Sequence, residues 1–195
     1  MDRAIFLFTF NFLYHIIYIS PFKNAMSHSH DNKGDSINHQ GNAVSSFWME
    51  VASHVLVFLL LVVNYSRDNN PITYFDMLLL FLAILGTLIR YKAYYDLNQY
   101  YTFDIGIRKD HKLVTTGIYK FITHPGYLGS LLVIIPFFIF TLKGISYVLL
   151  LTHTSTIIYL FCDRIKKEEA MLLEHFGLDY KNYLINTKRF IPFVY

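Results

Sequence analysis

Five long apolar runs, separated by polar stretches, dominate the hydrophobic pattern of the chain. They cover residues 4–20, 47–65, 74–95, 127–142 and 145–162. A helix that crosses the hydrocarbon core of a bilayer needs about 20 apolar residues, and about 17 are tolerated. The pattern therefore predicts an all-α fold, a multi-pass transmembrane helical bundle of about five spans. Only Lys143 and Gly144 join the last two runs, which indicates a tight helical hairpin.

Composition favours a membrane location for the whole chain. Of the 195 residues, 54% are hydrophobic and only 16% are charged, whereas about a quarter of the residues of soluble domains are charged. The first run follows Arg3 as in a secretory signal, but no small-residue cleavage pattern comes after it, so we expect an uncleaved helix. The single cysteine, Cys162, excludes an internal disulfide. No basic cluster of the kind that binds nucleic acid is present in the sequence.

The distribution of Lys and Arg predicts the orientation of the spans. Cytoplasmic loops of membrane proteins collect these residues. With residues 21–46, 90–126 and 164–195 on the cytoplasmic side, 14 of the 17 Lys and Arg residues lie inside. The remaining three are Arg3, Arg67 and Lys143. The C-terminus is therefore expected to be cytoplasmic.

The polar loop at residues 21–46 contains residue types that bind metals. They are His28, His30, Asp31 and His39. A flexible loop without ordering apolar residues makes a poor metal cage, because the ligands are not held in a fixed geometry. We therefore expect a solvated linker and no metal site. This loop and the helices around it form an N-terminal region, 1–89, and residues 90–195 form a second region.

Residue types that can bind a ligand or take part in catalysis gather in the stretch "HKLVTTGIYKFITHPGYLG", residues 111–129. The stretch is polar, contains two His and is broken at Gly117. Pro125 suits the first turn of a helix, where its missing N–H costs nothing. The free N–H groups of such a helix start suit an anionic group or a ligand carboxylate. Pro136, inside the fourth run, is expected to kink the helix.

The tail carries a carboxylate in an unusual position. The stretch "DRIKKEEAMLLEHFG", residues 163–177, predicts a helix that continues from the fifth run and ends at Gly177. Helical spacing places four apolar residues on one face of this helix: Ile165, Leu172, Leu173 and Phe176. Glu169 lies in the middle of this apolar stripe. An inward carboxylate is costly without a partner. A salt bridge, for example to Arg164 or Lys112, and a ligand contact both satisfy this requirement.

These motifs resemble the isoprenylcysteine carboxyl methyltransferase family, which is related to the phospholipid methyltransferases. The matching stretches are "HKLVTTGIY" (111–119), "HPGYLG" (124–129), "DRIKKEEAMLLEHFG" (163–177), "YKNY" (180–183) and "KRFIPF" (188–193), with "DL" (96–97) at the family's distance from His111. Each motif alone is a weak signal of the family, whereas the ordered set of motifs with these spacings is a strong one. The set covers residues 90–195. The resemblance implies a multi-pass membrane enzyme that uses S-adenosylmethionine.

The resemblance also implies the site residues. Carried over residue by residue, the cofactor pocket comprises His111, Leu113, Val114, Gly117, Tyr119, His124, Pro125, Tyr127, Glu168 and Glu169. The helical tail would close this pocket on the cytoplasmic side. Arg189 is the candidate catalytic residue, as the group that holds an acceptor carboxylate. The other interpretation of Arg189 is an interfacial cation that reaches phospholipid headgroups.

The implied reaction is methylation of the C-terminal carboxylate of a prenylated cysteine or a similar lipophilic acceptor. The acceptor would arrive from the bilayer, either a prokaryotic inner membrane or the endoplasmic reticulum membrane. Three alternatives remain open: methylation of a phospholipid amine or a small thiol, an NADPH-dependent reductase like the sterol reductases, and a non-catalytic membrane protein of this fold.

The sequence departs from the family's pattern at three positions. Thr123 stands where Arg is usual, Asn98 where Gly is common, and Asn186 where relatives often have a basic residue. Arg binds a carboxylate through two parallel hydrogen bonds, which Thr cannot reproduce. The departure at Thr123 therefore affects cofactor affinity or the choice of substrate.

The charge distribution yields a direct test of topology. Residues 96–125 and 164–195 are both expected to be cytoplasmic. Cysteines introduced as Lys109→Cys and Lys181→Cys should be protected from a membrane-impermeant thiol reagent added to sealed cells. Labelling of either position from the outer face would contradict the predicted orientation.

Overall fold

The computed structural model describes residues 71–101, 106–107, 111–142 and 147–189, together with the single residues Thr9, Phe12 and Leu59. The regular elements in these ranges are helices, with irregular segments between them. The chain forms α3 (Tyr74–Leu97), η1 (Asn98–Tyr100), η2 (Gly117–Lys120), α4 (Pro125–Leu142), α5 (Tyr147–Phe176) and α6 (Leu178–Asn186), where η1 and η2 are short 3-10 helices. The predicted helical class is confirmed for this part of the chain. The runs at 4–20 and 47–65, the loop at 21–46 and the junction Lys143-Gly144 lie outside the described residues.

Helix α3 begins at Tyr74 because the residue before it caps the helix. The Thr73 hydroxyl accepts a hydrogen bond from the Asp76 N–H at 3.3 Å, and the Asp76 carboxylate accepts one from the Thr73 N–H at 2.8 Å. This reciprocal arrangement satisfies two N–H groups that a helix start leaves free. Among the described residues, the helix that starts here is the one long and apolar enough to cross a membrane. The apolar part of α4, Pro125–Phe140, is shorter.

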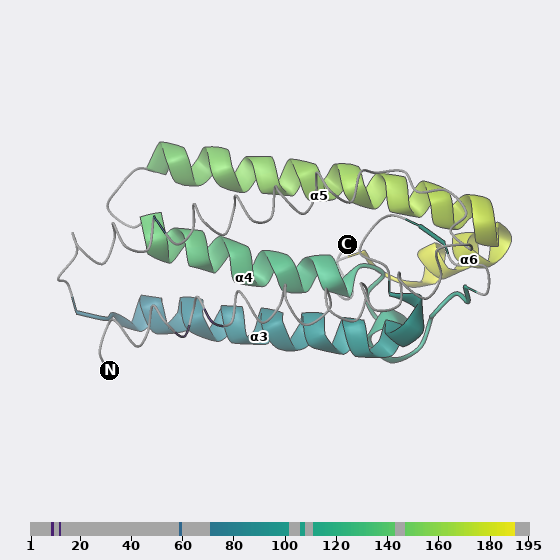
Figure 1. Ribbon diagram of the computed structural model, residues 1–195, viewed down its shortest axis with the longest axis horizontal. Helices are drawn as coiled ribbons and strands as arrows, with labels where there is room; N and C mark the ends of the chain where they lie inside the picture. Colours follow the sequence, from purple (N-terminus) through teal and green to yellow (C-terminus); the bar gives the residue numbers. More distant parts are fainter. Residues whose placement is uncertain are drawn as a thin grey trace.

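Helices α3 and α4 pack closely because glycines face each other at their contact. A Cβ added at Gly129 would lie 2.6 Å from the Gly86 carbonyl oxygen and 2.8 Å from the Arg90 nitrogen. Real Cβ atoms do not approach other atoms so closely, so the two backbones meet only because both side chains are absent. The hydrophobic core that extends along this contact comprises Leu79, Ala83, Val133, Ile134, Phe137, Phe138 and Phe140. In Figure 1, α4 lies between α3 and α5.

The third and fourth runs and the described part of the fifth, from Tyr147, are helical, and α5 continues into the tail as predicted. Gly177 ends α5 with φ +53°, and its N–H donates to the Leu173 carbonyl at 2.9 Å. A left-handed conformation favours glycine, because it has no Cβ to clash. Pro125 is the first residue of α4, as predicted, and α4 continues as a helix on both sides of Pro136.

One part of the predicted apolar stripe on α5 is wrong. Ile165 is buried at 4% exposure, but Leu173 is 45% exposed. Leu173 falls at the edge of the stripe, and the chain turns at Gly177 into α6, so the elements that pack on α5 meet only one side of it.

Helix α6 turns the chain back toward the start of α4. Lys188, just beyond α6, pairs with Ile122 in a single parallel β-bridge. The N–H of Thr123 donates to the Lys188 carbonyl at 2.7 Å, and the N–H of His124 donates to the Arg189 carbonyl at 3.1 Å. Figure 1 shows α6 at the end of the molecule where α3 ends and α4 begins. The tail and the stretch 111–129 therefore meet.

The glycine contact between α3 and α4 can be tested by adding one methyl group. Gly129→Ala should lower the free energy of unfolding by about 1–3 kcal/mol, because a tightly packed contact must open. Gly126→Ala, one turn earlier on α4, is the control, since its Cβ would meet nothing within 4 Å. Thermal unfolding of the purified protein in detergent measures both. Equal unfolding temperatures for the two variants would contradict the close approach.

Candidate functional site

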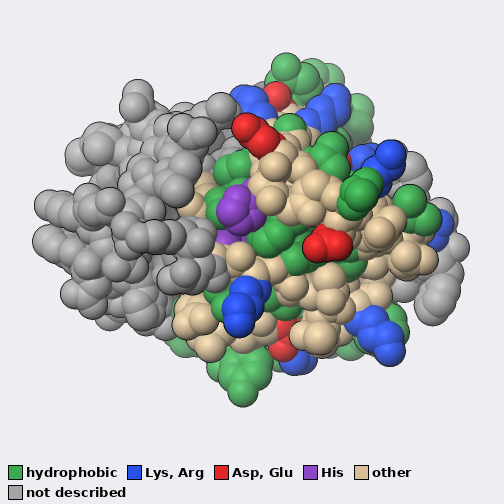
Figure 2. Space-filling model, turned by 90° about the vertical axis from the view of Figure 1, so that its right-hand side faces the viewer, with side chains coloured by type: hydrophobic (Ala, Val, Ile, Leu, Met, Phe, Trp, Pro, Cys, Tyr) green, Lys and Arg blue, Asp and Glu red, His purple; other side chains and the backbone are tan. Residues whose placement is uncertain are grey.

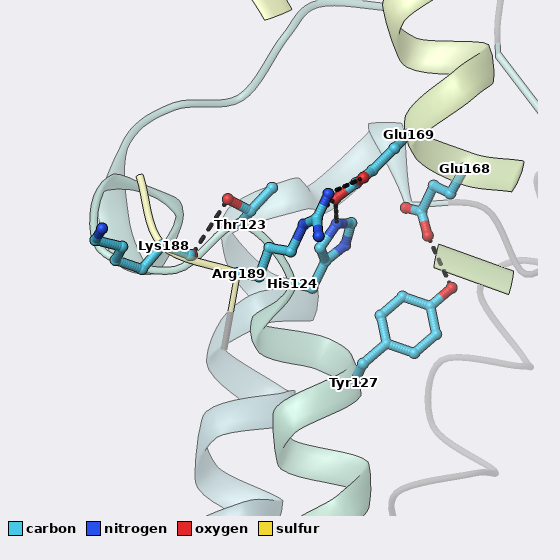
Figure 3. Close-up of polar contacts among 7 residues, drawn as sticks. All are labelled: Thr123, His124, Tyr127, Glu168, Glu169, Lys188 and Arg189. Carbon is cyan, nitrogen blue, oxygen red and sulfur yellow. Dashed lines mark hydrogen bonds and ion pairs between the residues drawn. The ribbon is translucent and has the colours of Figure 1, made fainter. Parts of the chain in front are cut away.

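Glu169 is held by two partners that come from distant parts of the chain. The guanidinium of Arg189 donates through Nε to Oε1 at 3.0 Å and through Nη2 to Oε2 at 2.9 Å. His124 Nε2 lies 3.0 Å from Oε1. Figure 3 shows the three side chains converging from α5, the tail and the start of α4. The Glu169 side chain is 13% exposed and that of His124 is 3% exposed, so the cluster is sheltered from water on the His124 side.

The expected salt bridge of Glu169 therefore exists, but its partners differ from those predicted. Arg164 does not pair with Glu169; its Nε donates to the Tyr127 hydroxyl at 3.0 Å. Tyr127 in turn donates to Glu168 Oε2 at 2.7 Å. Arg164 lies five residues before Glu169 on α5, which places it on a different side of the helix. Sequence spacing alone does not reveal the pairing with Arg189, because it depends on the turn of the chain at Gly177.

Glu168 and Glu169 differ in how many of their carboxylate oxygens accept hydrogen bonds from the protein. Both oxygens of Glu169 are bound. Among the described residues, Tyr127 is the partner that hydrogen-bonds to Glu168, through Oε2. In Figure 3 the other oxygen of Glu168 is turned toward His124. Within the described part of the chain, Glu168 therefore keeps one acceptor oxygen available.

Burial and ion pairing act in opposite directions on Glu169. Burial tends to raise the pKa of its carboxyl group, whereas the hydrogen bonds and charges of His124 and Arg189 lower it. The net result is a pKa below the usual value of Glu. The carboxylate form is the one that the folded protein stabilises.

The remaining predicted residues lie on the chain between α3 and α4 and at the first residue of α4. Leu113 and Val114 are half-buried, Tyr119 is buried and Pro125 is fully buried. The ring of His111 lies 5.2 Å from that of Tyr100 and 5.8 Å from that of Phe176. Phe176 is about two turns beyond Glu169 on α5. The structure thus brings His124, Tyr127, Glu168, Glu169 and Arg189 together, and places His111 beside Phe176, at the end of α5.

Asp96 fixes the loop at Gly117, a role that the residues alone did not reveal. Its Oδ2 accepts a hydrogen bond from the Ile118 N–H at 2.8 Å. Gly117 has φ +60°, and a Cβ at this position would fall on the Asp96 carboxylate. The "DL" pair at 96–97 is a match to the family's pattern, and its role as an anchor for the loop follows only from the fold. Its physical signal would have been a carboxylate near the end of an apolar helix.

Thr123, which stands where the family usually has Arg, is turned away from the glutamate cluster, and another arginine lies there. Thr123 is 5% exposed, and its hydroxyl donates to the Lys188 carbonyl at 3.2 Å. The guanidinium beside His124 comes from Arg189 instead. In Figure 3, Thr123 is turned toward Lys188 and away from the glutamates.

The end of the molecule that carries this cluster is rich in charge. Figure 2, which views the right-hand side of Figure 1, shows Lys and Arg side chains spread around the rim, with acidic and hydrophobic side chains between them. A polar, charged end on apolar helices suits a position at a membrane surface.

Apolar helices with a charged end suit an integral membrane protein, and comparison with known proteins specifies the family. The model of the isoprenylcysteine carboxyl methyltransferase (ICMT) family matches residues 78–174, about half of the chain. A probable protein-S-isoprenylcysteine O-methyltransferase of Oryza sativa subsp. indica is 31% identical over 59% of this chain and 60% of its own. The protein-S-isoprenylcysteine O-methyltransferase of Saccharomyces cerevisiae is 32% identical over 68% of this chain and 54% of its own.

A solved structure agrees with these sequence relatives. The eukaryotic intramembrane Ras methyltransferase ICMT superposes with a TM-score of 0.56 at 26% identity, covering 81% of this chain and 55% of that chain. The chain belongs to the isoprenylcysteine carboxyl methyltransferase family, and it is a membrane protein. It spans 60% of the rice relative and about half of the yeast relative and of the solved structure.

The ion pairs of Glu169 predict a pH dependence of stability. A lowered pKa in the folded state contributes stability above the unfolded pKa of about 4.3, and this contribution is lost as the pH falls through the folded pKa. Glu169→Gln should lower the free energy of unfolding at pH 7 by about 1–2 kcal/mol. It should also flatten the loss of stability below pH ~4.5.

Thermal unfolding between pH 7 and pH 3 measures both effects. Glu174→Gln is the matched control, because Glu174 is exposed on the same helix. An identical pH profile for wild type and Glu169→Gln would show that the ion pairs do not stabilise the fold.

Proposed function

We propose that the chain is an integral membrane methyltransferase that uses S-adenosylmethionine to methylate the C-terminal carboxylate of a prenylated cysteine. Family membership and the names of the relatives support this activity. One observation carries it: two adjacent glutamates reach the start of α4, one bound by His124 and Arg189 and the other with an acceptor left over. This arrangement suits a cationic ligand beside an anionic acceptor.

The residues present fit S-adenosylmethionine. The molecule carries an ammonium group, a sulfonium and ribose hydroxyls, which suit the remaining acceptor of Glu168. It also carries a carboxylate, which suits the free N–H groups at the start of α4. The residues that would hold it are His111, Leu113, Val114, Gly117, Tyr119, His124, Pro125, Tyr127, Glu168 and Glu169. When bound, it supplies an electrophilic methyl group.

The protein's task in this reaction is alignment. A carboxylic acid of this type has a pKa of about 3.5, so the acceptor is already ionised at neutral pH and needs no general base. The chain must orient the acceptor and exclude water. Arg189, whose side chain is 45% exposed, is accessible to a second carboxylate while Glu169 fixes its orientation. We propose Arg189 as the residue that positions the acceptor.

An ionised carboxylate is a better match to this site than an amine. A phospholipid amine must lose a proton before it can attack, which calls for a base within hydrogen-bond reach. In this cluster the Nε2 of His124 is engaged by Glu169, and the open acceptor of Glu168 is the group that we propose for the cofactor. The carboxylate acceptor makes no such demand.

The membrane arrangement that we propose has five spans and a cytoplasmic C-terminus. The site lies where α3 ends and α4 begins, which the distribution of Lys and Arg assigns to the cytoplasmic side. S-adenosylmethionine would enter from the cytoplasm, and the prenyl chain of the acceptor would remain in the bilayer.

Removing the negative charge of Glu168 tests the proposed function. Glu168→Gln should raise the dissociation constant for S-adenosylmethionine about 10-fold or more, because a hydrogen bond to a charged group is worth roughly 1.5–3 kcal/mol. Calorimetry on the purified protein measures this, with Glu174→Gln as the control. A parallel assay follows methyl transfer to a prenylcysteine analogue. Failure of the wild type to bind S-adenosylmethionine would overturn the proposal.

A further inference from the structure

Tyr180 is a buried residue outside the predicted site. It lies in the first turn of α6, is 1% exposed and belongs to the largest fully buried side chains of the described residues. Its ring lies 6.0 Å from that of Tyr183 on the same helix. The motif "YKNY" marks both tyrosines, but the two hydroxyls are treated differently by the fold.

The Tyr180 hydroxyl is buried and makes no hydrogen bond to any residue that the structure describes. The Tyr183 hydroxyl, by contrast, donates to the Tyr119 carbonyl at 2.7 Å. The Tyr127 hydroxyl accepts from Arg164 and donates to Glu168. Nearly all buried polar groups of native proteins have a partner, so an unsatisfied phenol calls for one beyond the residues that the structure describes.

Helix α6 lies against the candidate site, because the hydroxyl of its Tyr183 binds the Tyr119 carbonyl and the chain after it returns to Arg189. Burial raises the pKa of Tyr180, and the charges of Glu169 and Glu168 raise it further, whereas Arg189 lowers it. These are the side chains that converge on the start of α4. The phenol therefore remains protonated beside the carboxylate cluster, as a neutral group that can donate a hydrogen bond.

We propose that the Tyr180 hydroxyl is a binding contact for S-adenosylmethionine, donating to an oxygen of its ribose or carboxylate. The inference rests on the proposed function, because it names the same ligand. Tyr180 thereby joins Glu168 as a polar group that the folded chain leaves for the ligand. The tail helix α6 then contributes directly to the pocket, in addition to carrying the chain back to Arg189.

The test is Tyr180→Phe, which keeps the ring and removes only the hydroxyl. If the hydroxyl is unsatisfied without ligand, the unliganded variant should unfold about 2–4 °C above wild type, because a buried polar cost disappears. The same variant should bind S-adenosylmethionine about 3- to 10-fold more weakly. Higher stability with lower affinity is a combination that a purely structural role does not produce.

Tyr183→Phe is the matched control from the same helix. It loses the hydrogen bond to Tyr119, so its unliganded form should unfold below wild type. A lower unfolding temperature for Tyr180→Phe would show that its hydroxyl already has a partner, and would overturn the inference. Unchanged affinity in Tyr180→Phe, with normal binding by wild type, would overturn the inference alone. Absence of binding by wild type would overturn the proposed function and the inference with it.

Discussion

The doubly bound carboxylate of Glu169 is the interaction on which the candidate site depends. Its two partners come from distant parts of the chain: Arg189 lies 20 residues after Glu169, and His124 lies 45 residues before it. A charge this sheltered must be paired, since an unpaired buried carboxylate is strongly unfavourable. The pairing therefore holds the tail, α5 and the start of α4 in one arrangement. Glu168, the next residue, acquires its position from the same constraint.

The close contact of α3 and α4 stabilises this arrangement, because it fixes the start of α4. Gly86 and Gly129 let the two backbones meet. Arg90 of α3 donates through Nη1 to the Gly126 carbonyl at 3.3 Å and also to the Ser130 hydroxyl, in the first turns of α4. The start of α4 is thus fixed by α3, and His124 and Tyr127 are fixed with it. A site on a rigid helix start can hold a ligand more accurately than a site on a free loop.

Much of the candidate site could be predicted from short-range patterns. Pro125 indicated a helix start, Gly177 indicated a helix end, and the stripe around Glu169 indicated an inward carboxylate in need of a partner. Each of these signals depends on local geometry, which spacing along the chain reports well. The error at Leu173 has the same origin, because a helical wheel gives the width of a stripe but not which neighbours will cover it.

The sequence by itself determined the helical class, the helix ends at Pro125 and Gly177, and the need of Glu169 for a partner. The tertiary structure alone decided that this partner is Arg189 with His124, that Arg164 binds Tyr127, and that the Tyr180 hydroxyl stays unsatisfied. The reason is physical. Helix ends and amphipathic stripes follow from interactions within a few residues, whereas ion pairs between distant segments depend on how the chain turns and packs, which no local pattern encodes.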